Sequence, residues 1–229
     1  MKRAIIRIVL AIILLGAFYW WFTAPKWKGR GFSGKEDPWE APFIVDGILD
    51  QNDCKKIISN SDPKFTRSQV LSKDGTDSSR TSETAWLKRD DPLAEKMISK
   101  ACEITGKTPE HCEDIQVVRY KPGTYYKAHH DSCCEDNNFC RKFESDGGQR
   151  IGTLLVYLND DFSEGHTHFP DHGDLKLKAD PGSAIFFRPM CSSDTRCHPR
   201  ALHAGLPIGE GTKYVCNVWV RENKFRTQK

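Results

Sequence analysis

A change of hydrophobic pattern near residue 114 constrains the fold of this chain more than any other feature of its sequence. From there to the C-terminus, short β-branched and aromatic runs alternate with clusters of Gly, Pro and Asp. Runs of this kind predict strands that are separated by turns. We expect strands at residues 115–120, 151–158, 184–187 and 214–220.

The sequence before residue 114 has a helical pattern instead. Asp50 and the polar residues after it are typical of a capped helix start, and apolar residues recur at helical spacing from Pro92 to Thr105. Helices that precede a long series of strands indicate an α+β fold with a β-sandwich or barrel core. We assign residues 42–229 to this domain.

The N-terminus carries a continuous apolar segment. Residues 8–22 are all apolar, aromatic or Gly, and the run extends back to residue 4 with one Arg as its only charge. Since about 20 apolar residues cross the hydrocarbon core of a bilayer, we expect residues 1–22 to form one transmembrane helix, a signal anchor. A cleaved signal peptide is the alternative, although Trp20 and Trp21 are bulky where cleavage needs small residues. We expect residues 23–41 to be a linker.

The basic excess of the chain belongs to its N-terminal segment. Lys and Arg number 34 against 31 Asp and Glu, which gives a net charge of +3. Residues 1–35 hold seven of the basic residues and no acidic one, leaving 27 basic against 31 acidic residues in the rest. Because an acidic body repels a polyanion, we expect no nucleic-acid partner.

Nine cysteines are many for 229 residues and favour an oxidising compartment. Two pairs bracket short polar stretches, so we expect disulfides between Cys102 and Cys112 and between Cys191 and Cys197. The three cysteines at 133, 134 and 140 can pair in several ways or hold zinc with a nearby His. With the anchor, the cysteines indicate that the body of the protein is lumenal, in the endoplasmic reticulum or secretory pathway.

Seven of the eight histidines lie after residue 128. His129 and Asp131 are two residues apart, so on a strand both side chains point to the same face and His130 points to the other. A His and a carboxylate on one face supply two ligands of the facial triad that binds non-haem Fe(II), which a distant second His completes. A solvated surface pair is the alternative for so short a pattern.

The surroundings of this pair resemble a known family. Residues 120–131 (YKPGTYYKAHHD) match the Tyr-x-x-Gly-x-x-Tyr-x-x-His-x-Asp pattern of the prolyl 4-hydroxylases, which are 2-oxoglutarate- and Fe(II)-dependent dioxygenases. Residues 150–158 are similar to the family's central strand, residues 165–170 to its Gly-x-Thr-x-Phe-Pro turn, and residues 203–207 to its distal His-Ala-Gly-x-Pro.

Residues 80–82 and 113–120 also match the family, so the resemblance runs in order from about residue 43 to residue 225. It implies a double-stranded β-helix, or jelly-roll, core with the N-terminal helices packed on it. It also implies that His129, Asp131 and His203 hold Fe(II), with open positions for 2-oxoglutarate and O₂. His198 is the rival of His203, but it lacks the Ala-Gly-x-Pro context.

Lys213 follows His203 by ten residues and is expected to bind the far carboxylate of 2-oxoglutarate. By resemblance, Tyr120 and Tyr157 supply hydroxyl groups to the same cosubstrate. A surface Lys at a strand start and two core tyrosines are the alternatives.

The activity that the resemblance implies is hydroxylation of peptidyl proline to 4-hydroxyproline, with decarboxylation of 2-oxoglutarate to succinate and CO₂ and with ascorbate as a further cofactor. We expect Tyr126, Arg80, Trp219 and Arg150 to line the groove for a proline-containing peptide. The chain is too short for an additional peptide-binding domain, so we expect a membrane-tethered monomer. The same iron chemistry on lysyl or other substrates, or a catalytically silent binding module, are the alternatives.

Overall fold

The computed structural model describes residues 31–69 and 78–226. The expected membrane anchor, residues 1–22, lies outside the described residues. Within the two described ranges, no helix combines the length and the apolar character that a membrane crossing requires.

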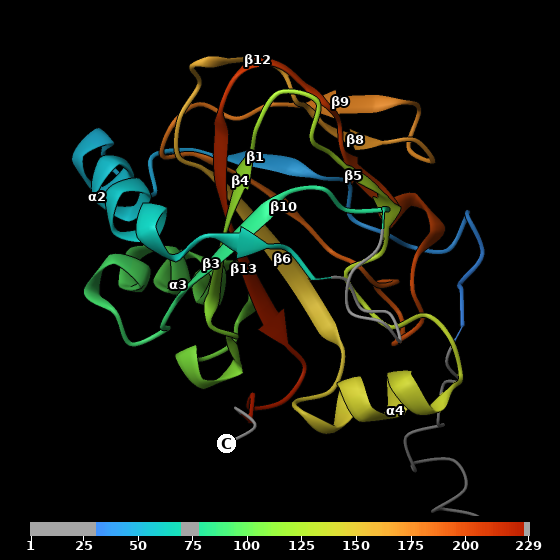
Figure 1. The fold of residues 1–229 in the computed structure, drawn as a ribbon. Helices are drawn as coiled ribbons and strands as arrows, with labels where there is room; N and C mark the ends of the chain where they lie inside the picture. The colour runs from blue at the N-terminus through green and yellow to red at the C-terminus, as the bar shows by residue number, and fades with distance from the viewer. Residues whose placement is uncertain (1–30, 70–77, 227–229) are drawn as a thin grey trace, which may run out of the picture.

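The domain is built on a large antiparallel sheet of seven strands, seen in the centre of Figure 1. Its strands, in spatial order, are β1 (Phe43–Val45), β10 (Ala184–Phe187), β6 (Arg150–Tyr157), β13 (Lys213–Arg221), β4 (Ile115–Tyr120), β3 (Glu83–Leu87) and β2 (Thr66–Arg67). The four strands that the sequence predicts are confirmed as β4, β6, β10 and β13.

A smaller sheet of four strands faces one side of the large sheet. It contains β5 (Tyr126–His129), β11 (His203–Gly205), β8 (Thr167–Phe169) and β9 (Leu175–Leu177), and a two-stranded ribbon joins β12 (Ile208–Gly211) to β7 (Phe162–Glu164). Phe169 and Leu177 of the small sheet pack with Leu155 and Phe187 of the large sheet in one apolar cluster. This mixed domain of facing antiparallel sheets is consistent with the jelly-roll core that the resemblance implies.

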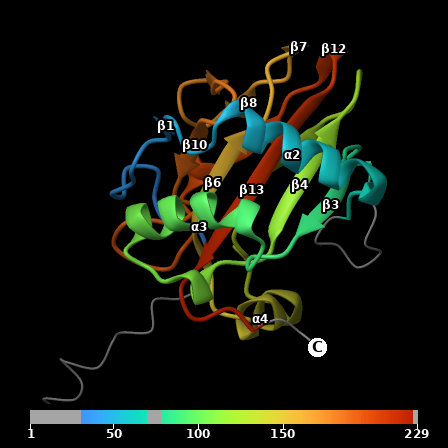
Figure 2. The same ribbon diagram turned by 90° about the vertical axis from the view of Figure 1, so that its left-hand side faces the viewer.

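Two helices, α2 (Gln51–Ser61) and α3 (Pro92–Thr105), lie across the other side of the large sheet, as Figure 2 shows. Both helices were expected. The side chain of Asp50 caps α2 by accepting a hydrogen bond of 2.8 Å from the backbone N–H of Asp53. The helix α4 (Asn138–Ser145) was not predicted, and three short 3₁₀ helices occupy Asp62–Lys64, Pro109–His111 and Pro199–Ala201.

Alternation along the central strands gives the large sheet two different faces. On β13, Cys216, Val218 and Val220 lie in the apolar core beneath α2 and α3. Lys213 and Trp219, on the same strand, line a cavity between the two sheets. The site therefore occupies the face that the helices leave uncovered.

The described part of the predicted linker packs against the domain. Residues 31–33 run beside Cys197, with hydrogen bonds of 2.9 Å from Ser33 N to Cys197 O and of 3.0 Å from Cys197 N to Gly31 O. Farther along, the ring of Trp39 stacks on His198 with 5.1 Å between ring centroids. This N-terminal strap, residues 31–40, lies against the segment that leads into β11.

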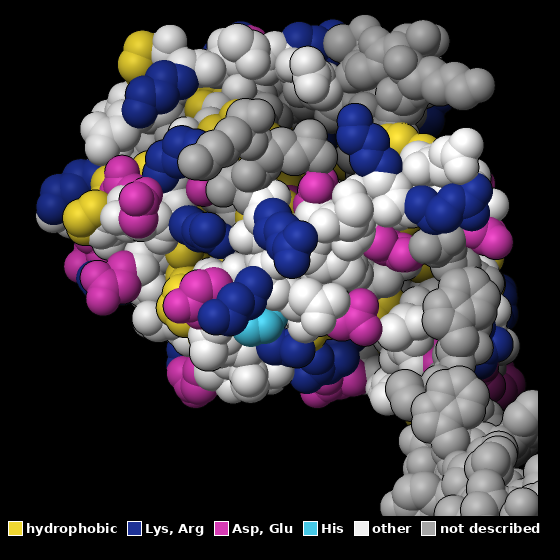
Figure 3. All heavy atoms as spheres, turned by 90° about the horizontal axis from the view of Figure 1, so that it is seen from below, with side chains coloured by type: hydrophobic (Ala, Val, Ile, Leu, Met, Phe, Trp, Pro, Cys, Tyr) yellow, Lys and Arg dark blue, Asp and Glu magenta, His cyan; other side chains and the backbone are white. Residues whose placement is uncertain are grey.

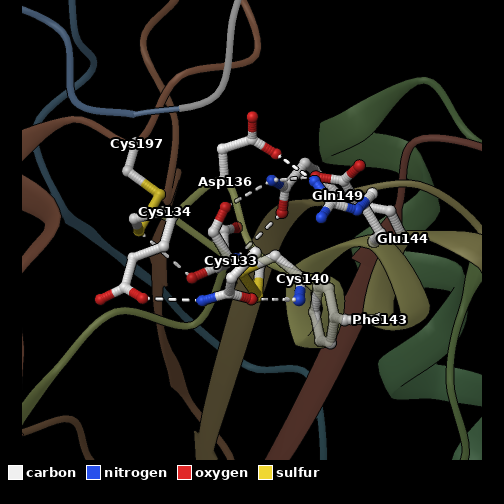
Figure 4. Close-up of a disulfide and its surroundings, with 12 residues drawn as sticks. Cys133, Cys134, Asp136, Cys140, Phe143, Glu144, Gln149 and Cys197 are labelled. Atoms are coloured by element: carbon white, nitrogen blue, oxygen red, sulfur yellow. Dashed lines mark hydrogen bonds and ion pairs between the residues drawn. A yellow bond between two sulfur atoms is a disulfide. The ribbon is translucent and has the colours of Figure 1, made fainter.

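The disulfides differ from the predicted pairs, as Figure 4 shows. Cys133 bonds Cys140 and Cys134 bonds Cys197, so the predicted Cys191–Cys197 disulfide is wrong. The fold brings the loop after β5 against Cys197, whereas the Cys191 thiol lies 3.2 Å from the hydroxyl of Ser193.

The predicted Cys102–Cys112 disulfide is not formed in the structure, where both cysteines are free thiols with their sulfur atoms 4.0 Å apart. The short polar stretch between them does bring the two side chains together. The prediction was therefore right about the proximity of the two side chains and wrong about the bond.

The face seen from below in Figure 3 interleaves Lys and Arg with Asp and Glu. Among the side chains coloured there, neither sign of charge forms a continuous patch. The surface of this face thus has the mixed charge of an ordinary solvated surface.

Candidate metal centre and active site

Three side chains converge at one end of the cavity between the sheets. The ligand atoms of His129, Asp131 and His203 lie within 4.8 Å of one another. Oδ1 of Asp131 lies 3.6 Å from Nε2 of His129 and 3.8 Å from Nε2 of His203. Antiparallel pairing places His129 of β5 directly opposite His203 of β11, which explains how residues so far apart in the sequence meet.

The other nitrogen of each imidazole is occupied by a backbone carbonyl. Nδ1 of His129 lies 2.8 Å from Lys127 O, and Nδ1 of His203 lies 3.0 Å from Ala201 O. Hydrogen bonds of this kind fix the ring with its proton on Nδ1 and leave Nε2 as a lone-pair donor. Both free nitrogens point toward the same carboxylate oxygen, so the three residues fit a divalent metal ion.

Asp131 is held by two donors of the large sheet. Its Oδ2 accepts hydrogen bonds of 2.7 Å from the Thr153 hydroxyl and 3.0 Å from the Trp219 indole N–H. Burial would raise the pKa of this carboxyl, but His203, His129 and Arg150 lower it well below its ordinary value. Asp131 is therefore an oriented carboxylate with Oδ1 left for a metal.

His203 is buried against the rings of Phe187 and Phe169, whose centroids lie 4.5 and 5.7 Å from its own. Burial, together with His129, lowers the pKa of His203 to about 4. The imidazole is consequently neutral at physiological pH, which is the form that binds a metal.

A buried lysine lies farther into the same cavity. Lys213, the first residue of β13, is 2% exposed, and its ammonium donates to Gly165 O at 2.6 Å and to the Tyr157 hydroxyl at 3.3 Å. No carboxylate of the described residues pairs with it. Burial and the charge of Lys178 lower its pKa to about 7. A buried cation without an anionic partner is costly, so this position favours an anionic ligand.

The two tyrosines expected at this end have different positions. Tyr120 pairs with Lys213 across β4 and β13 and lines the cavity. Tyr157 is fully buried, and its hydroxyl lies 2.9 Å from that of Thr167 and within reach of the lysine. Tyr120 therefore faces the cavity, whereas Tyr157 acts on it through Lys213.

An ion-pair network supports the wall beside the metal ligands. Nε and Nη2 of Arg150 donate to the two carboxylate oxygens of Glu113 at 2.7 and 2.8 Å, and Arg221 donates to the same carboxylate at 2.6 Å. Arg150 also stacks over the Trp219 ring at 3.6 Å and donates to Asp131 O at 3.2 Å. Arg150 thus holds both the indole and the backbone of a metal ligand in place.

The opposite wall carries Arg80 and Tyr126. The Arg80 guanidinium lies 4.6 Å from the centroid of the Tyr126 ring and donates to Ser82 and Gln116 at 3.0 Å. The Tyr126 ring in turn stacks on His129, with centroids 3.6 Å apart. All four residues predicted to bind the peptide, which are Arg80, Tyr126, Arg150 and Trp219, line the cavity together with the metal ligands.

The structure shows that two other histidines considered as ligands or neighbours of the ligands, His198 and His130, lie outside the metal-binding group. His198 is fully buried under Trp39 and accepts a backbone hydrogen bond, away from the cavity lining. His130 lies outside the ligand set but does line the cavity. Glu113, Thr153 and Thr167 were missed as functional residues. For Thr153, the sequence signal that could have revealed it was a polar residue within the apolar run of β6.

Comparison with known proteins agrees with this geometry. Residues 115–221 match the model of the 2OG-Fe(II) oxygenase superfamily. A protein of Acanthamoeba polyphaga mimivirus that is provisionally named a prolyl 4-hydroxylase is 40% identical over 85% of this chain and 79% of its own length. The chain belongs to the prolyl 4-hydroxylase family. It is therefore an oxidoreductase, a dioxygenase that uses Fe(II), 2-oxoglutarate and O₂.

Solved structures of prolyl hydroxylases have the same fold. The viral collagen prolyl hydroxylase of Paramecium bursaria Chlorella virus-1, in its 2-oxoglutarate complex, superposes with a TM-score of 0.61. It is 29% identical and covers 80% of this chain and 96% of its own. A Trichoplax adhaerens prolyl hydroxylase in complex with a hypoxia inducible factor peptide has a TM-score of 0.56 at 17% identity, covering 79% of this chain and 83% of its own.

Proposed function

We propose that this prolyl 4-hydroxylase family member converts peptidyl proline to 4-hydroxyproline in a proline-rich or collagen-like peptide. The observation that carries the proposal is the continuity of one cavity of about 360 Å³, in which the His129, Asp131 and His203 centre, the buried Lys213 and an open aromatic wall meet. Iron held by these three residues would supply O₂ activation coupled to the decarboxylation of 2-oxoglutarate, with one oxygen atom going to succinate and the other to the hydroxylated product.

Side chains of the cavity wall bind 2-oxoglutarate and the substrate proline. Lys213 provides the positive charge for the far carboxylate of 2-oxoglutarate, and Tyr120 closes the apolar side of that pocket. Trp219 and Tyr126 offer ring surfaces on either side of the metal ligands, where a pyrrolidine ring fits by apolar contact. Arg150 and Arg80 keep these two rings in place through the contacts described above.

Three further features belong to the same proposal. Ascorbate would keep the iron in its ferrous state between turnovers. Residues 1–22 would tether the enzyme, as a monomer, to the membrane of the endoplasmic reticulum or secretory pathway with the catalytic domain in the lumen. The apolar N-terminal run supports the tether, and the Cys133–Cys140 and Cys134–Cys197 disulfides support an oxidising compartment.

The test is a turnover assay with the full chain in detergent. The enzyme receives Fe(II), ascorbate, 2-oxoglutarate and either poly-proline, a collagen-like peptide or a lysine-rich peptide of equal length. We expect succinate release coupled to the formation of 4-hydroxyproline with the two proline-containing peptides and not with the lysine-rich peptide. Coupled hydroxylation of the lysine peptide, or Fe(II) binding without succinate release from any peptide, would contradict the proposal.

A further inference from the structure

One exposed aromatic side chain lines the catalytic cavity, and a second lies beside it. The large hydrophobic side chains that are exposed among the described residues are Phe32, Phe43, Ile44, Trp86 and Phe139. Phe32 and Trp86 are the most exposed of them, at 51% and 52%. Trp86 lines the cavity, and the Phe32 ring lies 5.2 Å from the ring of His130, which also lines it. Large apolar groups left open beside a binding cavity mark contact sites for a ligand.

The backbone holds Phe32 rigidly at this position. Phe32 forms a parallel bridge with Cys197, and Cys197 is bonded to Cys134, three residues after the metal ligand Asp131. The backbone that carries the ring is therefore tied to the loop after Asp131 by hydrogen bonds and by a covalent bond. A preorganised contact of this kind loses little entropy when a ligand binds.

His130, between Phe32 and the metal ligands, has an unused hydrogen-bonding atom. Its Nδ1 is buried and lacks a partner among the described residues. Buried polar atoms are nearly always paired, so a bound group is expected to supply the partner. A backbone amide or carbonyl of a peptide that passes Phe32 has the required chemistry.

Trp86 marks a different side of the cavity. It lies on β3, opposite Gln116 of β4, and Gln116 lies opposite Asn217 of β13. The amide of Asn217 donates to that of Gln116 at 3.0 Å, and both residues line the cavity together with Trp86. Polar amides thus lead from the catalytic residues on β13 to an exposed indole on the same face of the sheet.

Aromatic rings combined with scattered polar groups are the surface that binds proline-rich chains. Such chains adopt the polyproline II conformation, in which the backbone amides are unpaired and the rings of proline are exposed. We propose that Phe32 and Trp86 are docking points for residues of the substrate that flank the target proline. On this basis the enzyme favours extended proline-rich peptides over short ones, an inference that rests on the proposed proline hydroxylation.

The test compares Phe32→Ala and Trp86→Ala with the wild-type full chain on a long and a short proline peptide. Loss of one aromatic contact is expected to raise the KM for the long peptide about threefold to tenfold. The kcat at saturating peptide and the KM for 2-oxoglutarate stay unchanged, and so does the KM for the short peptide. Phe139→Ala is the matched control, because Phe139 is 41% exposed on α4 and does not line the cavity.

A conservative variant separates docking from folding. Trp86→Phe keeps an aromatic ring and should recover most of the lost affinity for the long peptide. The inference is overturned if both alanine variants keep the wild-type KM for the long peptide, or if long and short peptides lose affinity equally. Absence of proline hydroxylation in the wild type would instead refute the proposed function, so the two failures are distinguishable.

Discussion

The two faces of the large sheet are built from the same strands but differ in the polar and charged groups that they bury. The face beneath α2 and α3 contains only apolar groups at its centre, with Leu154, Val156 and Val218 fully buried. The opposite face buries Lys213 and Thr153 at one to two per cent exposure. Along one strand, residues that point to the helices therefore stabilise the core, and their neighbours that point to the cavity support the active site.

The difference shows which side of the sheet contains groups whose burial opposes folding. Apolar burial stabilises the helix-covered face by roughly 25 cal/mol for each Å² removed from water. On the other face, a buried ammonium and a buried carboxylate oppose folding unless a partner or ligand compensates them. The helix-covered face thus only stabilises the domain, whereas the other face combines a stabilising apolar cluster with buried charged groups that reduce the free energy of unfolding.

Removal of a metal ligand should give the largest effect on the catalytic face. Asp131→Ala is expected to lower 2-oxoglutarate turnover by more than the roughly 100-fold that loss of a ligand's supporting partner costs. Succinate release and Fe(II) binding would be measured together. His168→Ala is the control, because His168 pairs with Asp174 at 2.6 Å and does not line the cavity. Retained turnover in Asp131→Ala would break the assignment of this face to chemistry.

A substitution on the apolar face should affect stability without affecting the site. Leu154→Ala removes a fully buried side chain and is expected to lower the free energy of unfolding by about 2–5 kcal/mol, because it leaves a cavity. Denaturant unfolding measures the change. At a temperature where the variant is folded, its KM for 2-oxoglutarate should equal that of the wild type. A raised KM would show that the two faces are not separable.

Replacement of the buried lysine should weaken 2-oxoglutarate binding without lowering the stability of the domain. Lys213→Met should raise the KM for 2-oxoglutarate about 10- to 100-fold, since a charge-assisted hydrogen bond contributes about 1.5–3 kcal/mol. Without 2-oxoglutarate the variant should unfold at the same or a higher temperature than the wild type, because the buried charge is gone. An unchanged KM would mean that another residue binds the far carboxylate.

The pH dependence of the same residue has a defined sign. Burial lowers the pKa of Lys213 from 10.5 to about 7, so above about pH 7 the free enzyme must take up a proton to pair with 2-oxoglutarate. The KM for 2-oxoglutarate should therefore rise with pH, approaching tenfold per unit. In the free enzyme this group makes stability rise between about pH 7 and 10.5, because the unfolded chain binds more protons there. Lys213→Met should remove both trends.

The last prediction concerns Thr153, the neighbour of Leu154 in β6. Thr153→Val keeps the shape of the side chain but removes the hydrogen bond to Asp131 and is expected to weaken Fe(II) binding about 10- to 100-fold. A titration with Fe(II) under anaerobic conditions measures this change. Leu154→Ala is the control on the other face of the same strand. Equal Fe(II) affinities in Thr153→Val and the wild type would show that Trp219 alone orients the carboxylate.

Local patterns in the sequence predicted the elements that local forces determine. Hydrophobic period and capping residues located α2, α3 and the four central strands, because each signal lies within a few neighbouring residues. The spacing of His129 and Asp131 likewise placed both side chains on one face. The small sheet and α4 were not located, since their strands and turns are short and polar.

The contacts that join distant segments could not be predicted in the same way. Cys134 and Cys197 are 63 residues apart, and only the folded arrangement of β5 beside β11 brings them together. Glu113, which lies just before β4, joins Arg150 of β6 and Arg221 of β13 in one ion-pair network. Resemblance to a family supplied His203 and Lys213, but it gave no information about the cysteines of this chain.

The Cys134–Cys197 disulfide also reduces the conformational entropy that the chain loses when the metal ligands come together. In an unbridged chain, Asp131 and His203 would have to meet across a loop whose closure costs conformational entropy that grows with the logarithm of its length. The bond begins three residues after Asp131 and ends six residues before His203, so it closes nearly all of that loop beforehand. In the oxidised chain, the distal ligand reaches the other two as a near neighbour along the covalent path.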